Sequence, residues 1–187
     1  FNSHSISIYT LEADGSLTPQ IPAAVATGVN PSSVTIHPTK PFVYAVNTGA
    51  GTISAYTMGA GGSLTAAGSP VLAGVNPGAV VIDPTGKFAY VANAGSGTIL
   101  VYTINQTSGA LTVATLAGTG SNPISISIRQ IGSGVYAYVP NFRSNSISVY
   151  SVDQTTGFLT GLAAAGTGTN PYFVAIDPTG KFAYAAN

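Results

Sequence analysis

Two side chains, His4 and Arg143, are the strongest candidates for chemistry in this sequence. The 187 residues include five Lys and Arg, five Asp and Glu, and two His. A histidine can accept a proton from water, and an arginine can bind an anion or a developing oxyanion. His4 could therefore act as a base that activates water, and Arg143 as an anion clamp. They are our candidate catalytic residues.

The composition excludes several other kinds of chemistry. The chain has no cysteine, so it can form neither disulfides nor thiolate metal sites. The carboxylates are scattered and the two histidines belong to loops at opposite ends of the predicted strands, so we expect no metal site and no cofactor. A formal net charge of zero gives no electrostatic footprint for nucleic acid. No apolar run reaches the roughly 20 residues that a membrane-spanning helix needs.

A repeat that runs through the whole chain positions these residues. Its first marker is the dipeptide Asn-Pro, spaced by 46, 46 and 48 residues, which begins at Asn30, Asn76, Asn122 and Asn170. Its second marker is a tetrad that starts with Tyr and ends at Asn47, Asn93, Asn141 and Asn187. A further Tyr follows nine residues after each of the first three tetrads, at Tyr56, Tyr102 and Tyr150.

The two ends of the chain match complementary parts of one repeat. Asn187 closes the fourth tetrad, and if Phe1 is placed after it, Tyr9 falls nine residues further on. Residues 1–9, Phe-Asn-Ser-His-Ser-Ile-Ser-Ile-Tyr, then match residues 142–150, Phe-Arg-Ser-Asn-Ser-Ile-Ser-Val-Tyr. The chain therefore holds four repeats, with the cut in the middle of one.

Each repeat reads as four antiparallel strands. Alternating apolar residues predict the first strand, the tetrad ends the second, the Tyr lies in the third, and Leu-Thr opens the outermost strand at Leu17, Leu64, Leu111 and Leu159. Asp-Pro-Thr-Gly at 83–86 and 177–180 predicts the turn between the first two strands. Four strands per repeat of about 46 residues predict an all-β propeller, because such a blade must stack on its neighbours.

The repeat resembles that of the YVTN, or lactonase-type, β-propeller family. The resemblance rests on Tyr90-Val91-Ala92-Asn93, on Asp-Pro-Thr-Gly-Lys-Phe at 83–88 and 177–182, and on Thr-Gly-Phe-Leu-Thr at 156–160. The family includes phosphogluconolactonase-like propellers. The resemblance covers essentially the whole chain. It implies rings of seven blades and sites with His, Arg and acidic side chains at the mouth of the central channel. Fold alone does not fix the activity.

We expect one propeller domain, 1–187, with three intact blades and two half-blades. Three arrangements would complete the ring. The chain could be part of a longer one, two chains could pair their half-blades in an eight-bladed homodimer, or the four repeats could close as a monomer. An unclosed arc would expose apolar sheet edges, which is an aggregation hazard. Self-association, or the remainder of a longer chain, is the partner that we expect.

The meander sorts the loops onto two faces. The loops with Asn-Pro and the loops after the tetrads share one face, which we call the Asn-Pro face; the remaining turns share the opposite, hairpin face. Only His4 and Arg143 place charged or titratable groups on the Asn-Pro face. The hairpin face receives the others, with Arg129 directed towards it: His37, Lys40, Asp83, Lys87, Asp177 and Lys181, together with Glu12, Asp14 and Asp153.

Each candidate also has a purely structural interpretation. His4 takes the repeat position of Gly97 and Asn145, so it also fits an ordinary loop residue. His37 and the turn aspartates fit caps of their own turns. The tetrad asparagines, Asn47, Asn93, Asn141 and Asn187, have two possible roles. Their side chains could bond to local backbone. Alternatively, together with Arg143, they could form a ring of groups at the channel that binds a carbohydrate or protein ligand. The recurring tyrosines fit packing between blades.

Two classes of function follow. The regularity of the repeat favours a non-catalytic binding or self-assembling propeller, because active sites usually break such symmetry. The family resemblance favours a lactonase-type hydrolase that acts on a sugar lactone. The low charge and the Thr-, Ser- and Gly-rich composition favour an extracytoplasmic location, periplasmic, secreted or at the cell surface.

Overall fold

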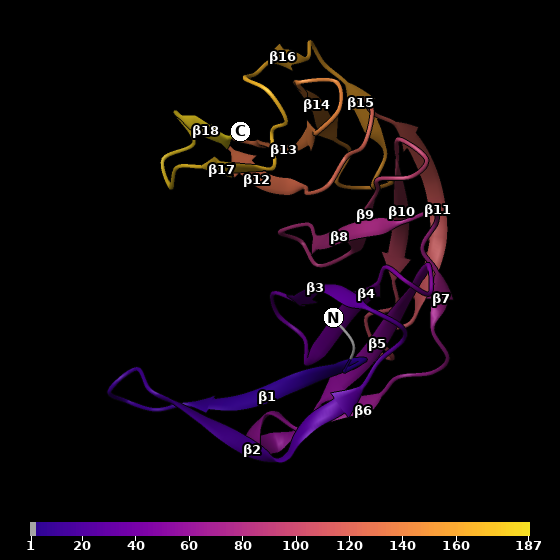
Figure 1. Cartoon of the computed structure of the whole chain (residues 1–187), viewed down its shortest axis with the longest axis vertical. Coiled ribbons are helices and arrows are strands. Elements are labelled where there is room, and N and C mark those ends of the chain that lie inside the picture. Colours follow the sequence, from indigo (N-terminus) through magenta and orange to yellow (C-terminus); the bar gives the residue numbers. More distant parts are fainter. Residues whose placement is uncertain (1–2) are drawn as a thin grey trace.

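The computed structural model describes residues 3–187, which form an arc of antiparallel sheets (Figure 1). The sheets follow one another in chain order, and each is a meander of sequential strands. Three are intact blades, and the two at the ends of the arc are two-stranded half-blades. The predicted all-β propeller with three intact blades and two half-blades is thereby confirmed. No helix in this range is long and apolar enough to cross a membrane.

The strand bounds follow the predicted repeat. The first half-blade contains β1 (Ser5–Leu11) and β2 (Leu17–Ala26). The first blade contains β3 (Pro31–Ile36), β4 (Phe42–Asn47), β5 (Thr52–Met58), a 3₁₀ turn η1 (Ala60–Gly62), and an outermost strand in two pieces, β6 (Leu64–Ala66) and β7 (Val71–Leu72). The second contains β8 (Pro77–Ile82), β9 (Phe88–Asn93), β10 (Thr98–Ile104) and β11 (Leu111–Gly118).

The third blade repeats this plan with a broken outermost strand. It contains β12 (Ser127–Ile131), β13 (Gly134–Asn141), β14 (Ser146–Val152), β15 (Leu159–Gly161) and β16 (Ala165–Gly166). The last half-blade contains β17 (Phe173–Ile176) and β18 (Ala183–Ala186). Strands β2, β6, β11 and β15 all begin at the Leu that the repeat predicts.

The apolar core lies between blades. One cluster joins Phe42, Tyr44 and Val46 of β4 to Val91 of β9 and Tyr102 of β10. A second cluster joins the second blade to the third in the same way. Every residue of β4 and β9 is buried, since these strands lie inside a sheet that is covered on both faces. A single blade could not bury these residues, so stacking stabilises the fold.

The hydroxyl of the third-strand tyrosine connects neighbouring blades. From the third strand, Tyr56 donates to the carbonyl oxygen of Ala26 at 2.8 Å, and Tyr150 to that of Gly118 at 2.5 Å. Tyr102 makes the equivalent bond to Leu72. The recurring tyrosines therefore pack and bond between blades, as predicted.

The turns on the hairpin face are capped by their own side chains. Asp83 accepts hydrogen bonds from the backbone N–H groups of Thr85 and Phe88, and Asp177 repeats this pattern in the last half-blade. His37 takes the place of the aspartate in the first blade, where its Nδ1 accepts from the backbone N–H of Lys40 at 3.0 Å. The predicted caps are confirmed.

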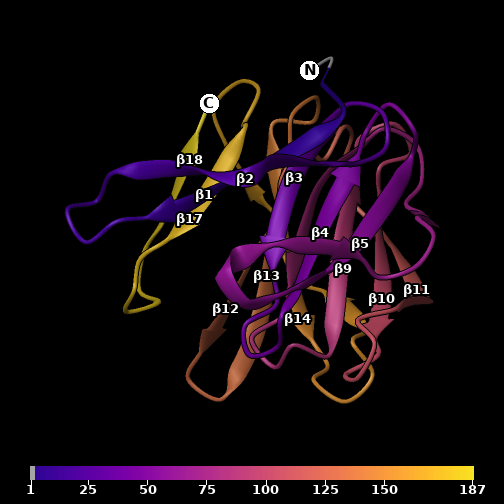
Figure 2. The same ribbon diagram turned by 90° about the horizontal axis from the view of Figure 1, so that it is seen from below.

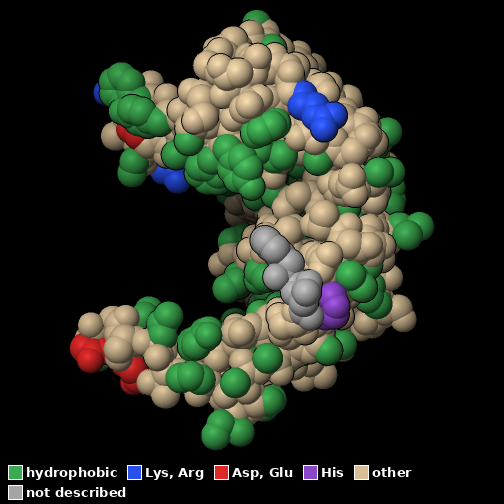
Figure 3. All heavy atoms as spheres, in the orientation of Figure 1, with side chains coloured by type: hydrophobic (Ala, Val, Ile, Leu, Met, Phe, Trp, Pro, Cys, Tyr) green, Lys and Arg blue, Asp and Glu red, His purple; other side chains and the backbone are tan. Residues whose placement is uncertain are grey.

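The half-blades do not close the ring. They form two separate two-stranded sheets at opposite ends of the arc (Figure 1). The space-filling view shows the open side of the arc between them (Figure 3). The closed four-bladed monomer is therefore not the arrangement observed, because adjacent blades turn by too little for four of them to complete a circle.

Candidate functional site

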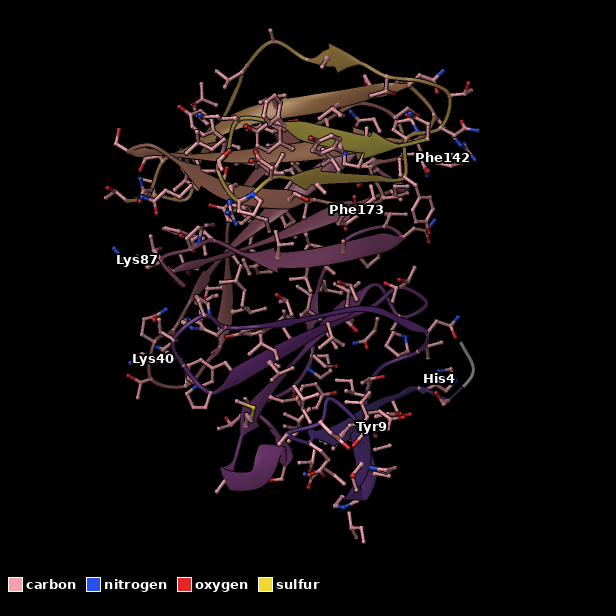
Figure 4. The ribbon with its side chains drawn as sticks, turned by 90° about the vertical axis from the view of Figure 1, so that its left-hand side faces the viewer. His4, Tyr9, Lys40, Lys87, Phe142 and Phe173 are labelled. Carbon is pink, nitrogen blue, oxygen red and sulfur yellow. The ribbon has the colours of Figure 1, made fainter. Side chains whose placement is uncertain are left out.

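The two faces of the arc carry the groups that the repeat assigned to them. Strands run from one loop-bearing face to the other in the view from below (Figure 2). Lys40 and Lys87 lie at one edge, whereas His4 and Phe142 lie at the opposite one (Figure 4). Arg129 donates from Nη2 to the carbonyl oxygen of Pro178 at 2.9 Å, in a hairpin-face turn. The Asn-Pro face is consequently poor in charge.

His4 has the environment of a loop residue. Its backbone φ is 48°, and its Nδ1 accepts a hydrogen bond of 3.1 Å from the backbone N–H of Asn30. Asn145, at the same repeat position, has φ of 50° and accepts from the N–H of Asn170 at 2.8 Å. The imidazole therefore replaces an asparagine that orders the loop, and the nitrogen facing Asn30 is occupied by that bond.

His4 and Arg143 do not form one site. His4 precedes β1 in the first half-blade, and Arg143 follows β13 in the third blade, so the first two blades lie between them. Figure 4 shows the same separation between His4 and Phe142, the neighbour of Arg143. The predicted pairing of a His4 base with an Arg143 clamp therefore has no geometric support within this arc.

Arg143 lines a groove of about 490 Å³ between the second and third blades. Two short segments form most of its walls: the loop after β9 (94–97) and the loop after β11 (119–122). Asn76 completes the lining, and Arg143 is the single charged residue among the ten that line it. The groove is thus a polar cleft with one cationic residue in its lining, which suits a ligand rich in oxygen.

Backbone hydrogen bonds fix the walls of the groove. Arg143 N–H donates to the carbonyl oxygen of Ser121 at 3.1 Å, and Ser144 Oγ accepts from Ser121 N–H at 3.0 Å. Asn122 Nδ2 donates across the blade boundary to the carbonyl oxygen of Ala94 at 3.4 Å. The guanidinium therefore extends from a loop whose backbone is already ordered, which reduces the entropy lost on binding.

An aromatic pair lies directly beside Arg143. Phe142 and Tyr172 meet edge to face, with ring centroids 6.4 Å apart. Tyr172 belongs to the segment before β17 and is 66% exposed. The pair places an exposed aromatic ring near the loop that carries Arg143.

Three of the four tetrad asparagines are buried within the blades. Asn47 accepts from Gly28 N–H at 3.0 Å through Oδ1 and donates to Ser54 Oγ at 2.9 Å. Asn141 accepts from Thr119 Oγ1 at 2.6 Å and donates to Ser148 Oγ at 2.9 Å. Asn47 and Asn141 therefore have structural partners, but these are mainly side-chain hydroxyls and not the local backbone that the sequence predicts.

Asn93 and Asn187 differ from the other two asparagines. Asn93 is 1% exposed, yet its Oδ1 has no hydrogen-bond partner. Ala73 stands where the fourth and third repeats have Thr167 and Thr119, and the hydroxyl that serves Asn141 is therefore missing next to Asn93. Asn187, at the last position of the last half-blade, is exposed.

Sequence reasoning missed the asparagines of Asn-Pro as groove residues. Asn76 and Asn122 both line the groove, and both adopt the left-handed conformation, with φ of 49° and 59°. The signal was present, because a recurring Asn before Pro is typical of a tight turn.

Among residues 3–187, no group of three or more His, Asp or Glu could hold a metal ion.

The fold and the comparisons define the class of protein. The family model "Lactonase, 7-bladed beta-propeller" matches residues 1–125, which is more than half of the chain. The chain therefore belongs to this lactonase family of β-propellers. A 6-phosphogluconolactonase from Cronobacter sakazakii is 50% identical over 44 residues, which cover 22% of this chain and 13% of that protein.

Two solved structures share the fold. A candidate 6-phosphogluconolactonase from Bacteroides uniformis superposes with a TM-score of 0.83 at 22% identity, over 98% of this chain and 57% of the other. Another, from Bacteroides fragilis, gives a TM-score of 0.80 at 26% identity, over 90% and 50%. The chain thus spans about half the length of these structures.

Proposed function

We propose that this propeller is a lactonase-type hydrolase of a sugar lactone, and that the Arg143 groove binds the lactone. The proposal rests on one observation above all: Arg143 is the single charged residue that lines a polar, backbone-ordered groove on the Asn-Pro face. Membership of the lactonase family and the phosphogluconolactonase-type relatives support the same class of substrate.

The lining of the groove favours a polyhydroxylated ligand. Asn76, Asn122, Ser96 and Thr119 place amide and hydroxyl groups in its walls. A sugar lactone has hydroxyl groups for these partners and one polar carbonyl for the cation. A volume of about 490 Å³ is within the range of small-molecule sites.

Arg143 would act on the charge that develops during hydrolysis. The oxygen of water attacks the lactone carbonyl carbon, and the carbonyl oxygen becomes an oxyanion that the guanidinium stabilises. The ring C–O bond then breaks, the ring oxygen takes a proton, and the product is an open hydroxy acid. No residue lining the groove has an imidazole or a carboxylate, so in this proposal the attacking water gives its proton to solvent.

The test compares Arg143→Gln with a matched arginine on the other face. Acid release from gluconolactone, and from its 6-phosphorylated form, is measured above the spontaneous rate. We expect Arg143→Gln to lower kcat/KM by about 10²–10³-fold, the usual effect of removing one oxyanion donor. Arg129→Gln should leave it unchanged, because Arg129 contacts a hairpin-face turn.

Two results would count against the proposal. One is a wild-type chain that is folded and does not accelerate either lactone. The other is acceleration that Arg143→Gln and Arg129→Gln leave equally intact, which would place the reaction elsewhere. The phosphorylated substrate separates a clamp for the phosphate, which acts through KM, from an oxyanion stabiliser, which acts through kcat.

A non-catalytic binding module is the second candidate function. The specific observation in its favour is that His4 and Arg143, the candidate base and clamp, are separated by two blades. In that case the groove would bind the open sugar acid through Arg143 without turnover. Binding of gluconate that Arg143→Gln abolishes, in a protein without lactonase activity, would support this second function. The extracytoplasmic location remains a prediction from composition.

A further inference from the structure

Arg143 occupies a repeat position that is glycine in the other two intact blades. The residue two positions after the tetrad asparagine is Gly49 in the first blade, Gly95 in the second and Arg143 in the third. In each blade the N–H of this residue donates to a carbonyl of the preceding Asn-Pro loop, at 3.0, 3.0 and 3.1 Å: those of Val29, Val75 and Ser121. The three loops are therefore equivalent in their backbone contacts, and only the third carries a side chain at this position.

Valine excludes a side chain from this position in the first two blades. A Cβ atom at Gly49 would lie 2.8 Å from Val29 Cγ1, and one at Gly95 would lie 2.6 Å from Val75 Cγ1. In both cases this methyl group is the nearest obstacle. Neither glycine has a left-handed φ, so the backbone itself would accept another residue. The close approach of the valine is therefore what requires glycine here.

The third blade changes both members of this pair. Ser121 stands in place of the valine, and Arg143 stands in place of the glycine. Serine has one γ atom where valine has two, which leaves room for the Cβ atom of residue 143. Ser121 N–H also donates to Ser144 Oγ at 3.0 Å, a bond that Ala50 at the same position of the first blade cannot accept. Two matched changes thus break the symmetry of the repeat beside the groove, as functional sites usually do.

We propose that Ser121 is a positioning residue for Arg143, because it leaves the space that an arginine needs and ties the two loops together. The inference rests on the proposed function and deepens it. The Ser121–Arg143 pair allows the third blade, and neither of the other intact blades, to present a cation to a carboxylate or a developing oxyanion. Arg143 is exposed, so the loop that carries it decides where its guanidinium lies. A valine at position 121 would press on its Cβ atom and displace that loop.

The first test measures acid release from gluconolactone. Ser121→Val should lower kcat/KM by about 10²-fold, the usual cost of misplacing a group by about 1 Å. Ser121→Ala, which keeps the space open, should retain the wild-type value. Adding Ser121→Val to Arg143→Gln should cause no further loss, because both changes act through one guanidinium. A loss that Ser121→Val causes equally with and without Arg143 would overturn the proposal.

Urea unfolding tests the same pair without a substrate. Ser121→Val should lower the urea midpoint in the wild type but not in Arg143→Gly, because the double variant restores the Val–Gly pair of the other blades. Equal shifts in the two backgrounds would overturn the positioning role. The reciprocal change is the control: Gly95→Ala should lower the midpoint, and adding Val75→Ser should recover it.

The two measurements separate this inference from the proposed function. A folded wild type that accelerates no lactone would refute the proposed function alone. The unfolding of Ser121→Val in the two backgrounds would still decide whether Ser121 positions Arg143. Circular dichroism shows that each variant keeps its strand signal before either measurement is made.

Discussion

The Tyr90 hydroxyl donates a hydrogen bond of 3.0 Å to the carbonyl oxygen of Gly157, which is 67 residues further along the chain. This contact joins the second strand of the second blade to a turn of the third blade. Tyr44 makes the equivalent bond to Gly109 at 2.8 Å. In both places an aromatic ring, Phe88 or Phe42, packs on the same glycine. The blades are thus joined by a polar contact and an apolar contact at one point.

Removing the Tyr90 hydroxyl should destabilise the arc. In Tyr90→Phe the Gly157 carbonyl loses a buried partner while the ring remains, so we expect a loss of about 0.5–1.5 kcal/mol. Tyr172→Phe is the control, because that side chain is 66% exposed. Urea unfolding measures both variants. Equal midpoints would show that the hydroxyl contributes nothing.

The glycine in this turn should not tolerate a side chain. Gly157 has φ of 76°, and a Cβ atom there would lie 2.5 Å from Phe88 Cδ1. Gly157→Ala therefore combines backbone strain of about 1–2 kcal/mol with overpacking of about 1–3 kcal/mol. Gly61→Ala, at φ of 78° with no atom within 4 Å, should show the backbone strain alone. Thermal unfolding of the two variants separates the contributions, and similar losses would contradict the predicted clash.

The tetrad asparagines should differ in their value to stability. Asn47→Ala removes bonds to Gly28, Thr52 and Ser54 and should cost about 1–3 kcal/mol more than Asn93→Ala. Asn93 has an unpartnered Oδ1, and its amide reaches only the Val91 carbonyl at 3.5 Å. The two truncations leave similar cavities, so the hydrogen bonds account for the difference. Denaturant unfolding of the pair checks it, and a greater loss at Asn93 would refute the reasoning.

The chain should lose stability above pH 10. Burial raises the pKa values of Tyr44, Tyr90 and Tyr102 well above the ordinary value of 10, with a further contribution from the Asp83 and Asp153 charges at Tyr90. Above pH 10 the unfolded chain releases tyrosine protons that the folded chain keeps, so the free energy of unfolding falls as pH rises. Below pH 10 both states are protonated at these tyrosines, and the stabilisation is complete.

Tyrosinate absorbance and circular dichroism, recorded together, check this pH dependence. The absorbance of the buried tyrosines should appear only as the strand signal is lost. Replacing Tyr102 with Phe should reduce the absorbance that accompanies unfolding. Full ionisation of all ten tyrosines in a chain that keeps its strand signal would contradict the prediction.

The sequence by itself determined the repeat, the strands and the sorting of loops onto two faces. These features depend on local pattern: Leu17 and Leu111 open outermost strands because turn residues precede them, and Asp83 caps its turn through neighbours within five positions. The sequence also placed Arg143 on the Asn-Pro face, beside Asn76 and Asn122. Each of these properties is set by contacts within one repeat.

Only the tertiary structure decided which candidate residues meet. Asn47 and Asn141 are buried because the adjoining loop and strand surround them. The tetrads alone left both the ligand-binding and the structural interpretation open. His4 and Arg143 lie in equivalent loops, between the second and third strands of their repeats, but the first two blades separate these loops. The groove beside Arg143 forms from loops of two blades, so its existence depends on how the blades pack and not on the sequence of either loop.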